Sequence, residues 1–130
     1  MTDTSGTLTS SKESPRFDDV KDVLYWYAGD AFSIDWDLEL MNIDSETPHP
    51  YAEGDRLIIT FFDAKKNQVQ QFNFTNILNN TVTTVFTPAI SKKFPVGLYT
   101  YCIKYCWMDG QQERIQTIVD NKKVKVEACH

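Results

Sequence analysis

The clearest pattern in the sequence is a strict alternation of apolar and polar residues within residues 29–40. The apolar positions are Phe32, Ile34, Trp36, Leu38 and Leu40, and the polar positions between them are Ser33, Asp35, Asp37 and Glu39. Successive side chains of a β-strand leave on opposite faces, whereas a helix would spread both sets around its circumference. The alternation therefore predicts a half-buried strand with one apolar face and one acidic face.

Similar patterns predict further strands along the chain. They cover residues 20–28, 56–62, 69–74, 81–87, 98–107, 113–119 and 122–128. Turn-forming residues occupy positions 63–67, 108–111 and 120–121, and one helical turn is expected around residues 89–93. Short strands joined by tight turns are typical of a β-sandwich. We therefore predict an all-β fold: an immunoglobulin-like antiparallel β-sandwich of seven to eight strands, without a disulfide.

Two of these strands carry more specific expectations. In residues 98–107, one face holds only large side chains and is expected to face the core: Tyr99, Tyr101, Ile103, Tyr105 and Trp107. Residues 20–28 are rich in β-forming residues but alternate poorly, which favours an edge strand or a bulge.

The length and composition predict one domain with a polar leader. Residues 1–16 contain a single large apolar residue, Leu8, so they are expected to be a disordered leader. Residues 17–130 are expected to form a single β-sandwich domain, because 130 residues are enough for one core.

The net charge of the chain and the length of its apolar segments exclude some classes of binding partner. The formal net charge is −5, so the basic surface that binds nucleic acid is not expected. No run approaches the roughly 18 apolar residues of a membrane helix, so no membrane insertion is predicted. The N-terminus also lacks the basic and apolar regions of a signal peptide, which favours synthesis in the cytoplasm.

The cysteines have no metal-ligand spacing. Cys102 and Cys106 lie four positions apart on one predicted strand, or roughly 13 Å at about 3.3 Å per residue, so they cannot form a disulfide with each other. Either could reach Cys129, but three reduced thiols are the favoured interpretation in a cytoplasmic product.

No set of residues suggests catalysis. The histidines are His49, between two prolines, and His130, the last residue, and neither is a positioned base. Asp35, Asp37 and Glu39 share one strand face but are splayed along it, which favours a solvated acidic face over a calcium site. We predict a non-enzyme without cofactor or metal.

Carbohydrate binding is an alternative, because aromatic side chains of β-sandwiches can stack on sugars. The candidates are Trp26, Tyr27, Tyr51 and Trp107. Tyr51 is the one most expected to be exposed, since it lies with His49 and Glu53 in the long polar loop 42–54. This alternative predicts a glycan affinity that is lost in Tyr51→Ala or Trp26→Ala.

Several short motifs resemble those of the N-terminal domain family of phage baseplate upper proteins. They are Gly-Asp-Ala-Phe at 29–32 before an alternating strand, Arg-Leu-Ile-Ile-Thr-Phe at 56–61, Pro-Val-Gly-Leu-Tyr-Thr-Tyr at 95–101 and Met-Asp-Gly at 108–110. The resemblance spans roughly residues 20–127, and Ala31 stands where that family has threonine.

The resemblance implies a structural role without catalytic residues. The chain would be an immunoglobulin-like adaptor module in the tail of a phage or prophage-derived particle, bound to other tail or baseplate proteins. Whether it also forms a homo-oligomer is left open. The candidate partner-binding residues are Leu24, Tyr25, Trp26 and Tyr27 on the weakly patterned strand and His49, Tyr51 and Glu53 in the long loop.

Overall fold

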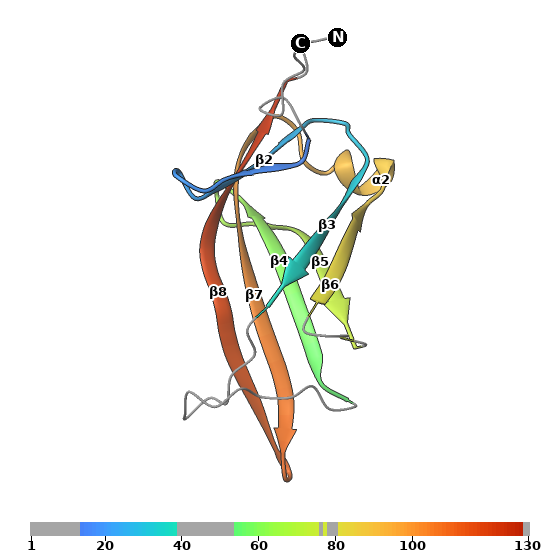
Figure 1. The fold of residues 1–130 in the computed structure, drawn as a ribbon, viewed down its shortest axis with the longest axis vertical. Helices are drawn as coiled ribbons and strands as arrows, with labels where there is room; N and C mark the ends of the chain where they lie inside the picture. The colour runs from blue at the N-terminus through green and yellow to red at the C-terminus, as the bar shows by residue number, and fades with distance from the viewer. Residues whose placement is uncertain (1–13, 39–53, 76, 78–80, 129–130) are drawn as a thin grey trace.

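The computed structural model describes residues 14–38, 54–75, 77 and 81–128 (Figure 1). The strands are β1 (Arg16–Asp18), β2 (Val23–Tyr27), β3 (Phe32–Asp37), β4 (Arg56–Asp63), β5 (Gln68–Phe74), β6 (Thr81–Phe86), β7 (Gly97–Asp109) and β8 (Gln112–Glu127). A short helix, α2 (Pro88–Ser91), lies between β6 and β7. Thr87 caps it, because the Thr87 side chain accepts a hydrogen bond from the Ile90 backbone N–H.

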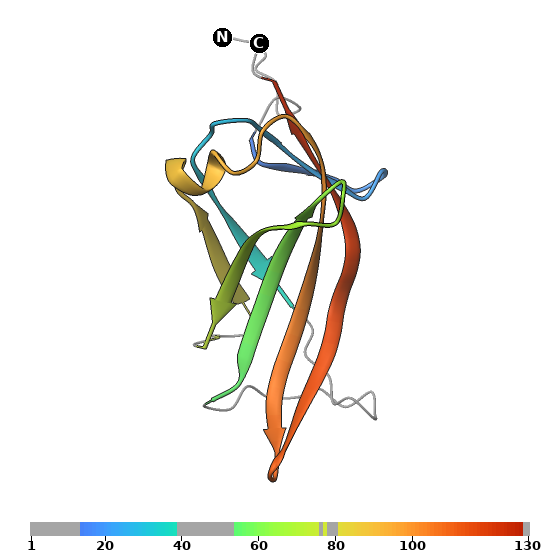
Figure 2. The ribbon, with the colours of Figure 1, turned by 180° about the vertical axis from the view of Figure 1, so that it is seen from behind.

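The strands form two sheets that pack as a sandwich (Figures 1 and 2). The large sheet has the order β1-β2-β8-β7-β4-β5, and the small sheet consists of β3 and β6. The prediction of an all-β sandwich is thereby confirmed. Cys102 and Cys106 are free, as expected, while Cys129 lies outside the described residues. Neighbouring strands in the described sheets run antiparallel, except for β2 and β8, which run parallel.

An aromatic cluster fills the space between the sheets. Trp26 is fully buried, and its ring lies 5.1–6.1 Å from the rings of Phe32, Phe61, Phe86 and Phe94. Such rings contribute both apolar burial and favourable tilted contacts. The predicted core row of β7 is confirmed, since Tyr99, Tyr101, Ile103, Tyr105 and Trp107 are all buried. The predicted alternation of β3 is confirmed as well: Ser33, Asp35 and Asp37 are exposed, and the apolar residues between them are half-buried.

The start of β7 is fixed by a tyrosine side chain. The Tyr99 hydroxyl donates a hydrogen bond to the Pro95 carbonyl oxygen at 2.5 Å, which ties the beginning of the strand to the crossover before it. Two residues later, Tyr101 packs edge-on against Trp36 of β3, with ring centroids 5.1 Å apart. This contact joins the two sheets.

Three expectations about the strands were wrong. Residues 20–28 do not form an edge, because β2 lies between β1 and β8. β1 was not predicted, and it begins at Arg16, the last residue of the expected leader, whose residues 1–13 lie outside the described part. Finally, Asp120 and Asn121 do not form a turn. They lie within a single strand, β8 (Gln112–Glu127), and form a bulge in it.

Candidate functional site

The structure buries most of the predicted binding residues on β2. Leu24 and Trp26 belong to the core, with exposed fractions of 5% and 0%, and Tyr25 is also buried at 8%. Tyr27 is half-buried. Leu24 and Trp26 point inward because β2 contributes alternate side chains to the core, so neither can contact a partner or a sugar at the surface. Tyr25 points to the opposite face.

The predicted loop residues His49, Tyr51 and Glu53 lie outside the described residues. On the acidic face of β3, two carboxylates are held by β6. The Thr83 hydroxyl donates to Asp35 at 2.6 Å, and the Thr81 hydroxyl donates to Asp37 at 2.8 Å. Glu39 lies outside the described part, and within that part no group of three potential ligands could hold a metal ion.

One surface hollow lies on the outer face of the large sheet, the face turned away from β3 and β6. It is a hollow of about 290 Å³ between β2, β8, β7 and the turn after β4. We call it the outer hollow, and its lining residues are Val23, Tyr25, Asp63, Ala64, Lys66, Leu98, Tyr99, Thr100, Lys123, Val124 and Lys125.

The register of the strands explains why these residues meet. Lys125 lies opposite both Tyr25 of β2 and Leu98 of β7. Lys123 in turn lies opposite Val23 and Thr100. Because directly paired residues share one face of a sheet, aromatic, aliphatic and cationic side chains from distant segments form a continuous surface.

The turn between β4 and β5 forms one wall of the outer hollow. Asp63 holds the turn, since its carboxylate accepts backbone hydrogen bonds from Lys65 and Asn67, each at 2.9 Å. The bond from Asn67 is the main cause that lowers the pKa of Asp63. Lys66, with a φ of 70°, extends from the turn to β8, where its Nζ donates to Asn121 at 3.1 Å.

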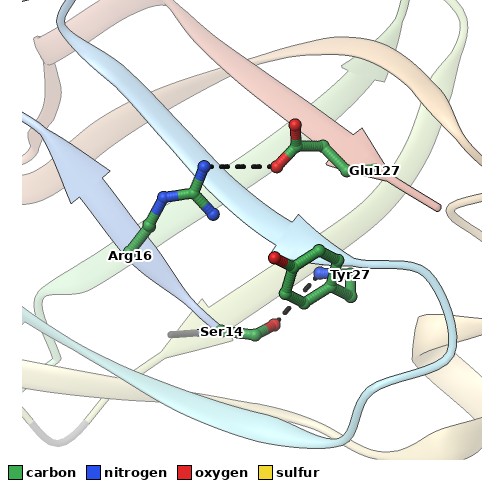
Figure 3. Close-up of polar contacts among 4 residues, drawn as sticks. All are labelled: Ser14, Arg16, Tyr27 and Glu127. Atoms are coloured by element: carbon green, nitrogen blue, oxygen red, sulfur yellow. Dashed lines mark hydrogen bonds and ion pairs between the residues drawn. The ribbon is translucent and has the colours of Figure 1, made fainter. Parts of the chain in front are cut away.

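The opposite wall depends on β1. The Arg16 guanidinium lies 4.4 Å from the centre of the Tyr25 ring. It also pairs with Glu127 at 3.3 Å (Figure 3). The Ser14 hydroxyl accepts a hydrogen bond from the Tyr27 backbone N–H at 3.0 Å. The segment before β2 therefore holds Tyr25 in place. Sequence reasoning missed this wall, because Ser14 and Arg16 fall in a stretch whose composition predicts disorder.

The charge around the outer hollow is mostly positive, although the chain carries a net charge of −5. Lys123 and Lys125 are exposed, and neither forms an ion pair within the described residues. An adjoining hollow of about 400 Å³ shares Lys66 and Thr100 with the first and adds Lys104. The carboxylates of Asp63 and Asp120 lie along the same surface. Leu98, one of the residues that line the outer hollow, is 63% exposed, so the surface combines an apolar residue with lysines.

The thiols near this face are not activated. Burial raises the pKa of both Cys102 and Cys106, which keeps them protonated at neutral pH. The outer hollow itself offers lysine ammonium groups, a tyrosine ring and aliphatic side chains. Together these groups can bind an anionic, partly apolar ligand, and they form no nucleophile and base in contact.

Comparisons with protein-family models, with curated proteins and with solved structures found no match to this chain. In the part of the chain that the structure describes, no helix is long and apolar enough to cross a membrane.

Proposed function

We propose that this chain is a non-catalytic adaptor module that binds other proteins through the outer hollow. The observation that carries the proposal is the placement of the exposed Leu98 among lysines that have no acidic partner in the described structure. Protein interfaces combine a buried apolar centre with a polar rim, and charges at the rim guide the approach of a complementary partner.

The chemistry of the hollow indicates the partner segment. The carboxylates of the partner segment would pair with Lys66, Lys123 and Lys125, and one of its aliphatic or aromatic side chains would pack on Leu98. A phosphate backbone is a poorer fit, because Asp63 and Asp120 lie on the same surface and the whole chain is acidic. We therefore infer an acidic protein segment with an apolar anchor.

We further propose that the partner is another tail protein of a phage or prophage-derived particle. The support is the resemblance of residues 29–32, 56–61, 95–101 and 108–110 to the baseplate family, together with a β-sandwich fold that suits an adaptor. The chain would then be made in the cytoplasm and reside in the virion tail.

The carbohydrate alternative gains no support from the described aromatic residues. Trp26 and Trp107 are buried, and the Trp36 indole N–H donates to Thr84 at 2.9 Å. A solvent-facing ring that could stack on a sugar is not found among these three tryptophans. The alternative therefore depends on Tyr27, which is half-buried, and on Tyr51, which lies outside the described residues.

The test is mass spectrometry of tail particles purified from the source bacterium after prophage induction. We expect this chain in a fixed ratio to other tail proteins, and a loss of incorporation in Lys123→Glu/Lys125→Glu. The control is Lys92→Glu/Lys93→Glu, which makes the same charge change at two exposed lysines beside α2. If intact particles lack the wild-type chain while the soluble lysate contains it, the tail role is wrong.

A further inference from the structure

The two outer faces of the sandwich carry opposite charges. On the small sheet, Asp35 and Asp37 of β3 are exposed, and neither β3 nor β6 contains a lysine or an arginine. On the large sheet, the outer hollow is lined by Lys123 and Lys125 of β8, which are also exposed. The outer faces of the two sheets lie on opposite sides of the sandwich (Figures 1 and 2), so each copy of the chain presents both.

The opposite charges on the two faces have the same spacing. Asp35 and Asp37 are two residues apart on one strand, and so are Lys123 and Lys125. Two residues advance a strand by roughly 6.6 Å, so the two carboxylates of one copy can lie against the two ammonium groups of another. Threonine hydroxyls of β6 donate to both carboxylates and hold them in place. This reduces the entropy that docking costs.

Each of the two surfaces also exposes an aliphatic side chain beside its charges. Val85 of β6 is 54% exposed and pairs with Ser33, which lies two residues before Asp35 on β3. Leu98 of β7 is 63% exposed and pairs with Lys125. A contact between the two surfaces would therefore bury apolar area in addition to pairing charges.

We propose that the acidic outer face of the small sheet docks on the outer hollow of a second copy of this chain. The inference rests on the binding chemistry of the proposed function, because it names a partner for the same hollow. The contact joins two different surfaces, so it is head-to-tail and adds copies in sequence. Because the two surfaces lie on opposite sides of the sandwich, the copies form an open row. The hollow at one end of the row remains available to a tail protein.

The overall charge of −5 does not prevent this contact. Repulsion between whole copies is screened beyond about one Debye length, roughly 8 Å at physiological salt. Within the contact, the lysines meet aspartates, and the exposed neighbours of the aspartates on β3 and β6 are uncharged. Asp63, a carboxylate of the hollow, already accepts hydrogen bonds from the backbone of its own turn.

The test is sedimentation velocity of the purified chain and of two charge variants. Asp35→Lys/Asp37→Lys reverses the acidic face, and Lys123→Glu/Lys125→Glu reverses the hollow. We expect the sedimentation coefficient of the wild type to rise with concentration, and each variant alone to remain a monomer. Equal mixing of the two variants should restore association, because the unchanged acidic face of one variant then meets the unchanged hollow of the other.

Restoration by mixing shows that both variants are folded and that these two surfaces form the contact. The control is Lys92→Glu/Lys93→Glu, which makes the same charge change beside α2 and should associate like the wild type. A wild type that remains monomeric up to about 1 mM would overturn the proposal. So would a face variant that associates unchanged, or a mixture of the two variants that remains monomeric.

The outcome for the adaptor role is separate. Asp35→Lys/Asp37→Lys keeps the hollow intact, so it should still enter tail particles although it no longer self-associates. If the wild type self-associates but is absent from tail particles, the adaptor role is wrong and the head-to-tail contact stands. If it enters tail particles through the hollow but remains monomeric when purified, the head-to-tail contact is wrong and the adaptor role stands.

Discussion

Trp26 has the largest fully buried side chain in the described structure, and its indole Nε1 has no hydrogen-bond partner there. Removing the ring leaves a cavity, so Trp26→Ala should lower the free energy of unfolding by about 3–5 kcal/mol. Trp26→Phe should cost less than half as much, because it keeps a ring and breaks no hydrogen bond. Urea denaturation measures both, and a cost below about 1 kcal/mol for alanine would contradict the central position of Trp26.

The raised pKa of Tyr101 predicts how the stability of the fold changes at high pH. Burial, with the charge of Asp22 as a smaller cause, raises the pKa of Tyr101 to about 12 from 10.0. In the unfolded chain the hydroxyl loses its proton first, so this contribution is fully present below about pH 10 and is lost as the pH rises toward about 12. We therefore expect the urea midpoint of Tyr101→Phe to fall less steeply than that of the wild type above about pH 10. If the urea midpoints of the two proteins fell equally steeply with pH, the raised pKa of Tyr101 would be contradicted.

At the scale of elements, the bulge in β8 depends on one backbone conformation. Lys122 pairs with Tyr101 and Val119 pairs with Ile103, so Asp120 and Asn121 both lie opposite Cys102. Asn121 has a φ of 52°, which glycine and asparagine tolerate better than β-branched residues. Asn121→Val should therefore cost about 1–3 kcal/mol relative to Asn121→Gly.

Both variants of Asn121 lose its contact with Lys66, so their difference isolates the backbone. Thermal unfolding of the two proteins measures it. Equal melting temperatures would mean that β8 accommodates valine by a change of register.

Local sequence patterns predicted the strands well, but they did not predict which distant strands pair with each other. β3 and β7 were predictable because one face is apolar, and the hairpin at Asp109 and Gly110 because Asp-Gly suits its turn. The division of β8 was wrong because Asp-Asn suits a bulge as well as a turn. The parallel pairing of β2 with β8 has no local signal, since residues about a hundred positions apart meet.

Of the residues that line the candidate site, Tyr25 was among the predicted binding residues, but Leu98 and Lys125 were missed for the same reason. Tyr25, Leu98 and Lys125 belong to three different strands, and only the register of the sheet brings them together. On their own strands, Leu98 and Lys125 look like ordinary members of an alternating pattern. The poor alternation of β2 suggested an edge, whereas β2 is covered by β1 on one side and β8 on the other.

At the scale of the whole molecule, the charge is unevenly distributed between the two outer faces. The small sheet exposes Asp35 and Asp37, and the large sheet exposes Lys104, Lys123 and Lys125. An acidic partner is therefore attracted by one face and repelled by the other, which orients it before contact. The effect acts over about one Debye length, roughly 8 Å at physiological salt.

This distribution predicts two separable kinetic effects for a partner isolated from tail particles. Lys123→Glu/Lys125→Glu should slow association at least tenfold, and added salt should slow the wild type but not this variant, because steering acts on the encounter. Leu98→Ala should leave association within about threefold and accelerate dissociation, because it removes apolar contact made only after docking. Surface plasmon resonance at several salt concentrations measures both rates. Equal effects of the two variants on dissociation alone would mean that the lysines are part of the buried contact rather than a steering rim.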